Sequence, residues 1–202
     1  QAVPSLSGDF EVIVDYKGAR RPASNPRPKK GVAPTNYWEI ESWQVQTYSW
    51  LRNQQPGHKP ISAGILIYVN ELSPSDTDMK DLISEIQHNE TDIVPISGSA
   101  DYYAIQRWQP GQPITLSDEF KLKRAIRIVG VSPAEVSNAL SEIDRTIGDI
   151  ELCALNENAT GNIPNNWPST GKPNDCVACD FRRFCPSQTK ASGKIVYPSA
   201  PG

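Results

Sequence analysis

Two charged residues at the end of a predicted strand carry the first sign of chemistry in this chain. The run Phe10–Lys17 ends in Asp15 and Lys17, which on a strand point to one face, roughly 7 Å apart. Such a pair is costly to bury without a purpose. A divalent metal supplies one, because the carboxylate binds the ion while the lysine stabilises charge on an attacking water or a phosphate. A strand that simply runs out into solvent is the alternative for this pair taken alone.

The segment that follows this strand is strongly basic. Residues 18–35 combine four prolines with no acidic residue. The cations in it are Arg20, Arg21, Arg27, Lys29 and Lys30. A solvated loop and a phosphate-contacting, DNA-binding arm beside the strand fit this composition equally well.

The most specific local pattern is a cysteine cluster near the C-terminal end. Cys176, Cys179 and Cys185 follow the spacing Cys-x2-Cys-x5-Cys, and Pro186 comes directly after. A Cys-x2-Cys turn directs two thiolates at one ion or cluster, and a complete tetrahedral set needs a fourth ligand. The Cys-Pro ending favours an iron–sulfur cluster, with zinc as the alternative. Cys153, on a predicted helix, is either the fourth ligand or a small buried apolar residue.

A helix must position the partners of the charged pair. It is expected from Asn36 to about Asn53, and one stripe of it carries Ile40, Gln44, Tyr48 and Leu51. A glutamine on an apolar stripe needs hydrogen-bond partners for its amide, unless it lies at the edge and reaches water.

The rest of the chain predicts an alternation of strands and helices. The run 62–70 is apolar on both faces, which is typical of a central strand. The further elements expected are a helix over 76–89 capped by Ser75, a strand over 102–108, a helix from Ser117 to about Val129, and a helix from Pro133 to about Leu155. Residues 156–175 read as a connection without regular structure and 187–202 as a tail.

Length and charge limit the possible functions. The chain has 202 residues, enough for one domain with a small appendage, and a net charge of −3. That charge argues against a nucleic-acid coat, so any such binding must use a local patch. No apolar run is long enough for a membrane helix. The clustered cysteines indicate a metal in a reducing compartment, and we expect a cytoplasmic location.

Three motifs in order resemble a known family. The Asp15-x-Lys17 strand, the Gln44-x3-Tyr48 helix and the three cysteines resemble the RecB-like branch of the PD-(D/E)xK nucleases, over about residues 8–186. More narrowly, they are similar to the members with a 4Fe-4S cluster, such as the nuclease parts of bacterial helicase–nuclease complexes and the CRISPR-adaptation exonucleases. Each motif is short, and the three in this order are hard to obtain by chance.

The resemblance implies an α/β fold with a central mixed sheet flanked by helices, a restriction-endonuclease-like core. This core would span residues 1–155 and be followed by a linker and cysteine cluster over 156–186. Asp15 and the Tyr16 carbonyl would bind Mg²⁺ or Mn²⁺, and Lys17 would orient the attacking water or stabilise charge. Gln44 and Tyr48 would position Lys17 or contact DNA. The partners implied are single-stranded DNA or DNA ends, and a helicase or CRISPR adaptation proteins.

The chain also departs from the family pattern. Upstream of the Asp-x-Lys strand, the family carries a second acidic metal ligand, in many members also a histidine, and the first cysteine of the cluster. Residues 1–8 offer no counterpart to any of these. Because the chain begins with Gln1, we expect a fragment or a chain numbered from an internal point; otherwise these residues have been lost. Three functions therefore stay open. They are a metal-dependent DNA exonuclease or end-processing nuclease, an inactive nuclease-fold module that binds DNA or scaffolds a complex, and a zinc-stabilised binding module.

Overall fold

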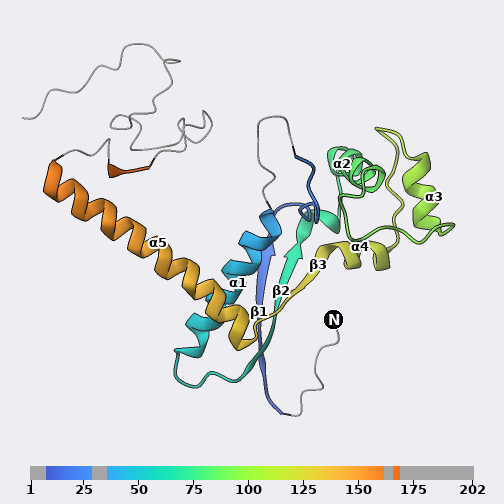
Figure 1. The fold of residues 1–202 in the computed structure, drawn as a ribbon. Helices are drawn as coiled ribbons and strands as arrows, with labels where there is room; N and C mark the ends of the chain where they lie inside the picture. Colours follow the sequence, from blue (N-terminus) through green and yellow to red (C-terminus); the bar gives the residue numbers. More distant parts are fainter. Residues whose placement is uncertain (1–7, 29–35, 162–165, 169–202) are drawn as a thin grey trace, which may run out of the picture. The chain divides into compact units, whose positions relative to one another are not determined.

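The structure, a computed structural model, describes residues 8–28, 36–161 and 166–168. The chain divides into two units, Gln1–Leu140 and Ser141–Gly202, and each is described by itself. The first unit holds a small sheet with helices around it (Figure 1). Its elements are β1 (Glu11–Lys17), α1 (Tyr37–Asn53), β2 (Ile61–Tyr68), the short 3₁₀ helix η1 (Val69–Glu71), α2 (Asp76–Gln87), α3 (Ala100–Arg107), α4 (Asp118–Ala125), β3 (Ile126–Val129) and the start of α5 (Pro133–Thr160).

The sheet is mixed, with the strand order β1-β2-β3. β1 and β2 are parallel, and α1 is the crossover that parallel neighbours require. β3 then pairs with β2 in the antiparallel sense. The expected α/β fold with helices around a mixed sheet is therefore confirmed at this level. A restriction-endonuclease-like core remains a prediction.

The position of α1 depends on a glycine in β2. Gly64, Leu66 and Tyr68 are alternate residues of β2 on the face towards α1, where they pack with Val45 of the helix. The side chains of Leu66, Tyr68 and Val45 are fully buried. A Cβ on Gly64 would overlap Val45 Cγ1. The helix can approach the sheet this closely because this position has no side chain.

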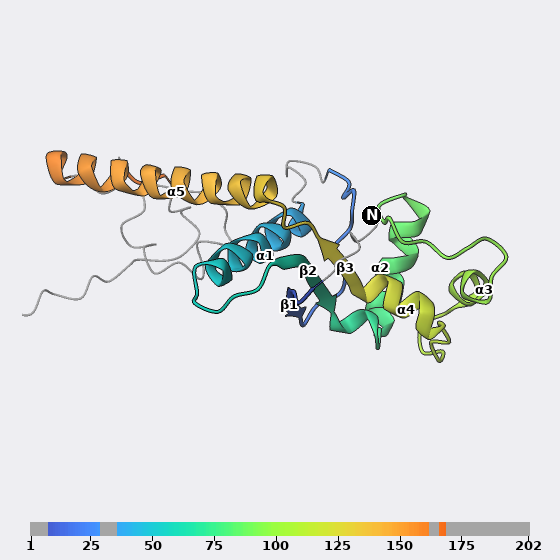
Figure 2. The same cartoon turned by 90° about the horizontal axis from the view of Figure 1, so that it is seen from below.

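A second apolar core lies beyond the sheet. Met79 and Leu82 of α2, Ile105 of α3 and Phe120 of α4 pack together, with Leu116 completing the cluster. Figure 2 shows these three helices grouped at one end of the sheet, where β2 finishes and β3 begins. The second core therefore fixes the helices that follow the carboxyl end of β2.

Two predicted elements are wrong. The strand expected over 102–108 is helix α3, because Gly98 turns the chain with φ +80° and Ser99 caps the helix by accepting from the Tyr102 N–H. The β-propensity of the two adjacent tyrosines is outweighed by this cap. The helix expected up to Val129 ends at Ala125, and Ile126–Val129 form β3. These four residues alternate in burial and pair with β2, which explains the change.

Helix α5 begins where the sequence predicts. Ser132 and Glu135 form a capping box, in which the Glu135 carboxylate accepts from the Ser132 N–H at 2.9 Å. The helix continues to Thr160, past the expected end near Leu155. From Ser141 onward it belongs to the second unit. None of the helices in the described ranges has the length and apolar character needed to cross a membrane.

Candidate functional site

The site is built on the carboxyl end of β1. Asp15 and Lys17 share the face of β1 that α1 covers, as their spacing requires. Lys17 Nζ lies 2.8 Å from Asp15 Oδ2, and each side chain is about one-fifth exposed, at 19%. The pair is therefore shielded by the helix and still reachable from solvent.

Helix α1 supplies the next two residues. Lys17 Nζ donates to Gln44 Oε1 at 2.6 Å, and Gln44 Nε2 donates to the Tyr48 hydroxyl at 2.7 Å. Gln44 and Tyr48 are four residues apart and so lie on one side of the helix. The structure thus connects Asp15, Lys17, Gln44 and Tyr48 in one row, although they come from two elements.

The hydrogen bonds fix the orientation of each group. Because Gln44 accepts from the ammonium, its amide nitrogen must turn to Tyr48, whose oxygen accepts. The Tyr48 hydroxyl hydrogen has no acceptor among the described residues, and 41% of this residue is exposed. A lysine carries three N–H donors, of which Asp15 and Gln44 engage two. Lys17 and Tyr48 can therefore each donate to a bound ligand.

One oxygen of Asp15 lacks a hydrogen-bond donor in the described part of the chain. Its Oδ2 atom is buried, and apart from the Lys17 ion pair no described residue donates a hydrogen bond to it. Mg²⁺ in proteins is commonly held by one or two carboxylates together with substrate phosphates and water. The donor set of Asp15 and the Tyr16 carbonyl fits an ion that is shared with a phosphate. Within the described ranges, no three His, Cys, Asp or Glu side chains gather to hold an ion on their own.

A carboxylate on α1, Glu41, also lies at this end of the sheet, and the sequence did not point to it. Tyr68 pairs with Lys17 across the strands and is fully buried, and its hydroxyl donates to Glu41 Oε2 at 2.6 Å. Burial raises the pKa of Tyr68, and the hydrogen bond to Glu41 and its charge add to this. Glu41 was detectable in principle, because it comes three residues before Gln44 and so lies on the same side of α1.

The apolar stripe expected on α1 is not its buried face. Val45 and Ser49 are the buried residues of the helix. Ile40, Tyr48 and Leu51 are 54%, 41% and 46% exposed. Gln44 therefore reaches Lys17 from the edge of the helix and not from its centre.

The basic segment after β1 differs most from expectation. Arg20 Nη1 lies 2.6 Å from Glu85 Oε1, and Arg27 Nε lies 2.7 Å from Glu90 Oε1. Arg21 is only 4% exposed, which leaves its guanidinium little surface for a phosphate. Phosphate contact by Arg20 and Arg27 stays a prediction and would have to compete with these pairs. Lys29 and Lys30 lie outside the described residues.

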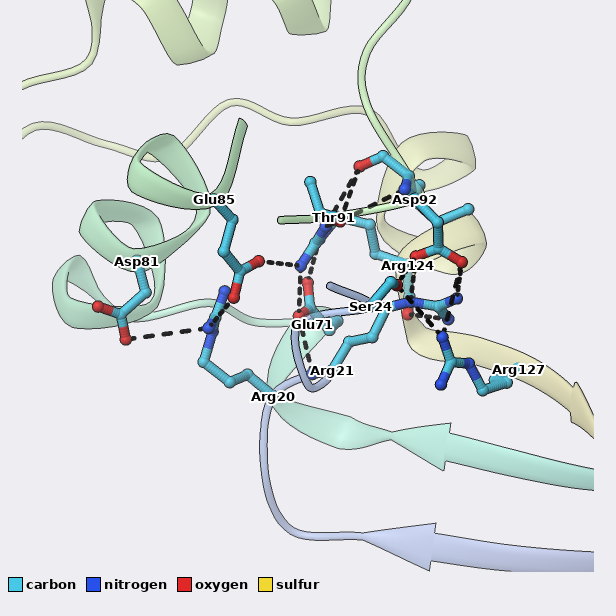
Figure 3. A network of polar contacts seen from close by, with 11 residues as sticks. Arg20, Arg21, Ser24, Glu71, Asp81, Glu85, Thr91, Asp92, Arg124 and Arg127 are labelled. Carbon is cyan, nitrogen blue, oxygen red and sulfur yellow. Dashed lines mark hydrogen bonds and ion pairs between the residues drawn. The ribbon is translucent and has the colours of Figure 1, made fainter. Parts of the chain in front are cut away.

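Arg21 belongs to a buried network of charges (Figure 3). It donates through Nη2 to Asp92 at 2.7 Å and through Nη1 to two backbone carbonyls, and its own N–H donates to Glu71 at 2.9 Å. Glu71 also accepts two bonds, at 2.6 and 2.9 Å, from Arg124, which is 1% exposed. Although burial opposes it, the hydrogen bonds from Arg21 and Ser24 hold the pKa of Asp92 well below its usual range. The network ties the segment after β1 to α2 and α4.

The predicted cluster ligands Cys176, Cys179 and Cys185 lie outside the described residues. Cys153 lies on α5 as a free, half-buried thiol. Whether it completes a cluster therefore stays a prediction. In comparisons with models of protein families, with curated proteins and with solved structures, no match to this chain was found.

Proposed function

We propose that the chain is a nuclease module that hydrolyses phosphodiester bonds in DNA with Mg²⁺ or Mn²⁺. The observation that supports this most is the row Asp15–Lys17–Gln44–Tyr48. The sequence predicts these four residues for this chemistry, and each lies 2.6 to 2.8 Å from the next in the row. An iron–sulfur cluster on Cys176, Cys179 and Cys185 remains part of the proposal, with zinc as its alternative.

Each residue has a task in this proposal. A bound Mg²⁺ or Mn²⁺ would supply an activated water and would neutralise charge on the phosphate. Asp15 and the Tyr16 carbonyl would hold that ion against the substrate. Lys17 would direct its third N–H at the phosphate oxygen on which negative charge develops. Gln44 would keep the ammonium in place, and Tyr48 would donate its hydroxyl hydrogen to the DNA strand.

An inactive nuclease-fold module that binds DNA or scaffolds a helicase or CRISPR complex is the second candidate. The observation that favours it is that, among the described residues, Asp15 is the one carboxylate paired with Lys17, whereas Glu41 accepts from Tyr68. A metal-dependent nuclease site usually has more than one acidic ligand, and two-metal sites clamp both reacting oxygens.

End-labelled single-stranded and duplex DNA incubated with Mg²⁺ or Mn²⁺ distinguishes the two candidates. The nuclease proposal expects metal-dependent cleavage that falls by at least about 100-fold in Asp15→Asn and in Lys17→Ala, the size of effect seen when one charge-stabilising group is removed. Asp9 and Lys59 are matched controls, because they form an exposed ion pair that is also 2.8 Å long. Asp9→Asn and Lys59→Ala should leave the rate unchanged. If the longest natural form of the protein cleaves no DNA end with either metal, the scaffold function is correct and the nuclease proposal is wrong.

A further inference from the structure

The face of the sheet opposite α1 is entirely apolar. The strand register places Val12, Val14 and Tyr16 of β1 beside Ala63, Ile65 and Ile67 of β2. Ile65 and Ile67 are in turn paired with Ile128 and Ile126 of β3. We call these eight residues the open face. It has no charged or polar position except the Tyr16 hydroxyl.

Most of the open face is exposed in the described part of the chain. Val12 and Val14 are 40% exposed and Tyr16 68%, and Ile126 and Ile128 are 41% and 52% exposed. On the other face Leu66 and Tyr68 are fully buried. Figure 2 shows α1 lying along that other side of β1 and β2. The sheet therefore has one face that α1 covers and one apolar face that no described element covers.

An uncovered face of this kind is unusual for parallel strands. Parallel pairs occur almost only in sheets with both faces buried, and β1 and β2 are parallel. The exposed fractions of the five most exposed of these residues amount to roughly 450 Å² of mostly apolar surface, within the range that the largest patch of a monomer covers. Apolar patches of this size are often functional.

We propose that two copies of this chain pair through their open faces, as the two layers of a sandwich. Two such patches would together bury about 900 Å², the size of a weak, reversible interface rather than a permanent one. The open face brings no like charges together when it meets itself, and the faces of two twisted sheets can pack about 10 Å apart. It carries no lysine or arginine, so it does not fit nucleic acid.

The pairing leaves the candidate site accessible. Asp15 and Lys17 lie on the α1 face of β1, whereas Val14 and Tyr16 lie on the open face. Two paired chains would therefore carry their sites on opposite outer surfaces. Dimerisation and catalysis are separate in this arrangement, so a failure of the nuclease proposal would not affect this one.

The test measures the molar mass of the full chain by light scattering and sedimentation over a wide concentration range. The wild-type chain should be a dimer that dissociates on dilution, and Val14→Lys should raise the dissociation constant by at least about 100-fold, because it buries a charge without a partner. Ile40 is a matched control, since it is 54% exposed on α1. Ile40→Lys should remain dimeric, and its dissociation would show that pairing uses α1, which overturns the proposal.

A mixing experiment removes the ambiguity of a variant that loses its fold. Val14→Lys and Val14→Glu should each be monomeric with the circular dichroism of the wild type, and an equal mixture should recover dimers. A wild-type chain that stays monomeric at high concentration overturns the proposal, whether or not it then binds neutral lipid vesicles or another protein. A wild-type dimer that Val14→Lys leaves intact overturns it as well.

Discussion

Replacing Gly64 by alanine tests how closely α1 must approach the sheet. Glycine inside a strand costs about 0.5–1 kcal/mol relative to alanine, so backbone propensity alone predicts that Gly64→Ala stabilises the fold. The structure predicts the opposite. The new methyl group would overlap Val45 Cγ1 and lie 3.2 Å from Val129 Cβ. Both valines are buried, Val45 fully, so neither side chain can move aside freely.

The size of the effect follows from these two opposing terms. Overpacking a filled core costs about 1–3 kcal/mol, which exceeds the gain in propensity, so we expect a net loss of about 1–2 kcal/mol. The helix relieves the overlap by moving off the sheet, which lengthens the 2.6 Å bond from Lys17 to Gln44. Denaturant unfolding of the variant measures the first consequence, and DNA cleavage, if present, measures the second.

A double-mutant cycle with Val45→Ala isolates the cause. Val45→Ala alone leaves a cavity and should cost roughly 2 kcal/mol. In that background the methyl group of Gly64→Ala fills vacated space, so the second substitution should stabilise by about 0.5–1 kcal/mol. The change of sign corresponds to a coupling energy of about 2 kcal/mol. If Gly64→Ala has the same effect in both backgrounds, the close approach of α1 does not explain the glycine.

Three further outcomes follow from the contacts described above. Gln44→Leu removes the acceptor that holds Lys17 and should lower kcat for DNA cleavage about 100-fold with little change in KM, as expected for a misplaced group. Glu71→Gln leaves buried guanidinium charge uncompensated and should cost about 3–5 kcal/mol in denaturant unfolding. Arg52 lowers the pKa of Glu11 to about 2, from an ordinary value of 4.5. Because the pKa of Glu11 is lower in the folded than in the unfolded chain, its charge stabilises the fold above pH 4.5, and this contribution disappears as the pH falls towards 2. Glu11→Gln should remove that part of the acid dependence of the unfolding free energy, measured by denaturant unfolding at a series of pH values.

Matched substitutions check that these effects are local. Gln46 is also on α1 but donates to the Gly130 carbonyl, so Gln46→Leu should leave kcat unchanged. Glu142 pairs with Arg145 at an exposed position, and Glu142→Gln should change the unfolding free energy by less than about 1 kcal/mol. Equal effects of Glu71→Gln and Glu142→Gln would contradict the role given to the buried network.

The row of site residues was predictable because local periodicity determines it. Asp15 and Lys17 share a face of any strand, and Gln44 and Tyr48 share a side of any helix. A crossover helix between parallel strands must also pack on the sheet. The sequence could not show which side of α1 packs, because Val45 and Ser49 are the buried residues of the helix and the fit of Val45 depends on Gly64, which is distant in the chain.

The fate of the basic segment was not predictable from local sequence. The carboxylates that pair with it, Glu71, Glu85 and Asp92, are 50 to 71 residues away in the chain. Composition marks residues 18–28 as cationic and gives no sign of these distant partners. The same holds for β3, whose four residues form a strand because β2 offers a free edge to them.

The buried network changes the expected basis of DNA binding. Affinity for a phosphate backbone comes mainly from cations that are free to replace its counterions. Arg20, Arg21 and Arg27 instead neutralise carboxylates of the chain itself, and Arg52 is paired with Glu11. Arg20, Arg21 and Arg27 thereby tie the segment after β1 to the rest of the unit, and Arg52 ties the start of β1 to α1. In the described part of the chain these arginines are therefore paired within the protein rather than free to replace the counterions of DNA.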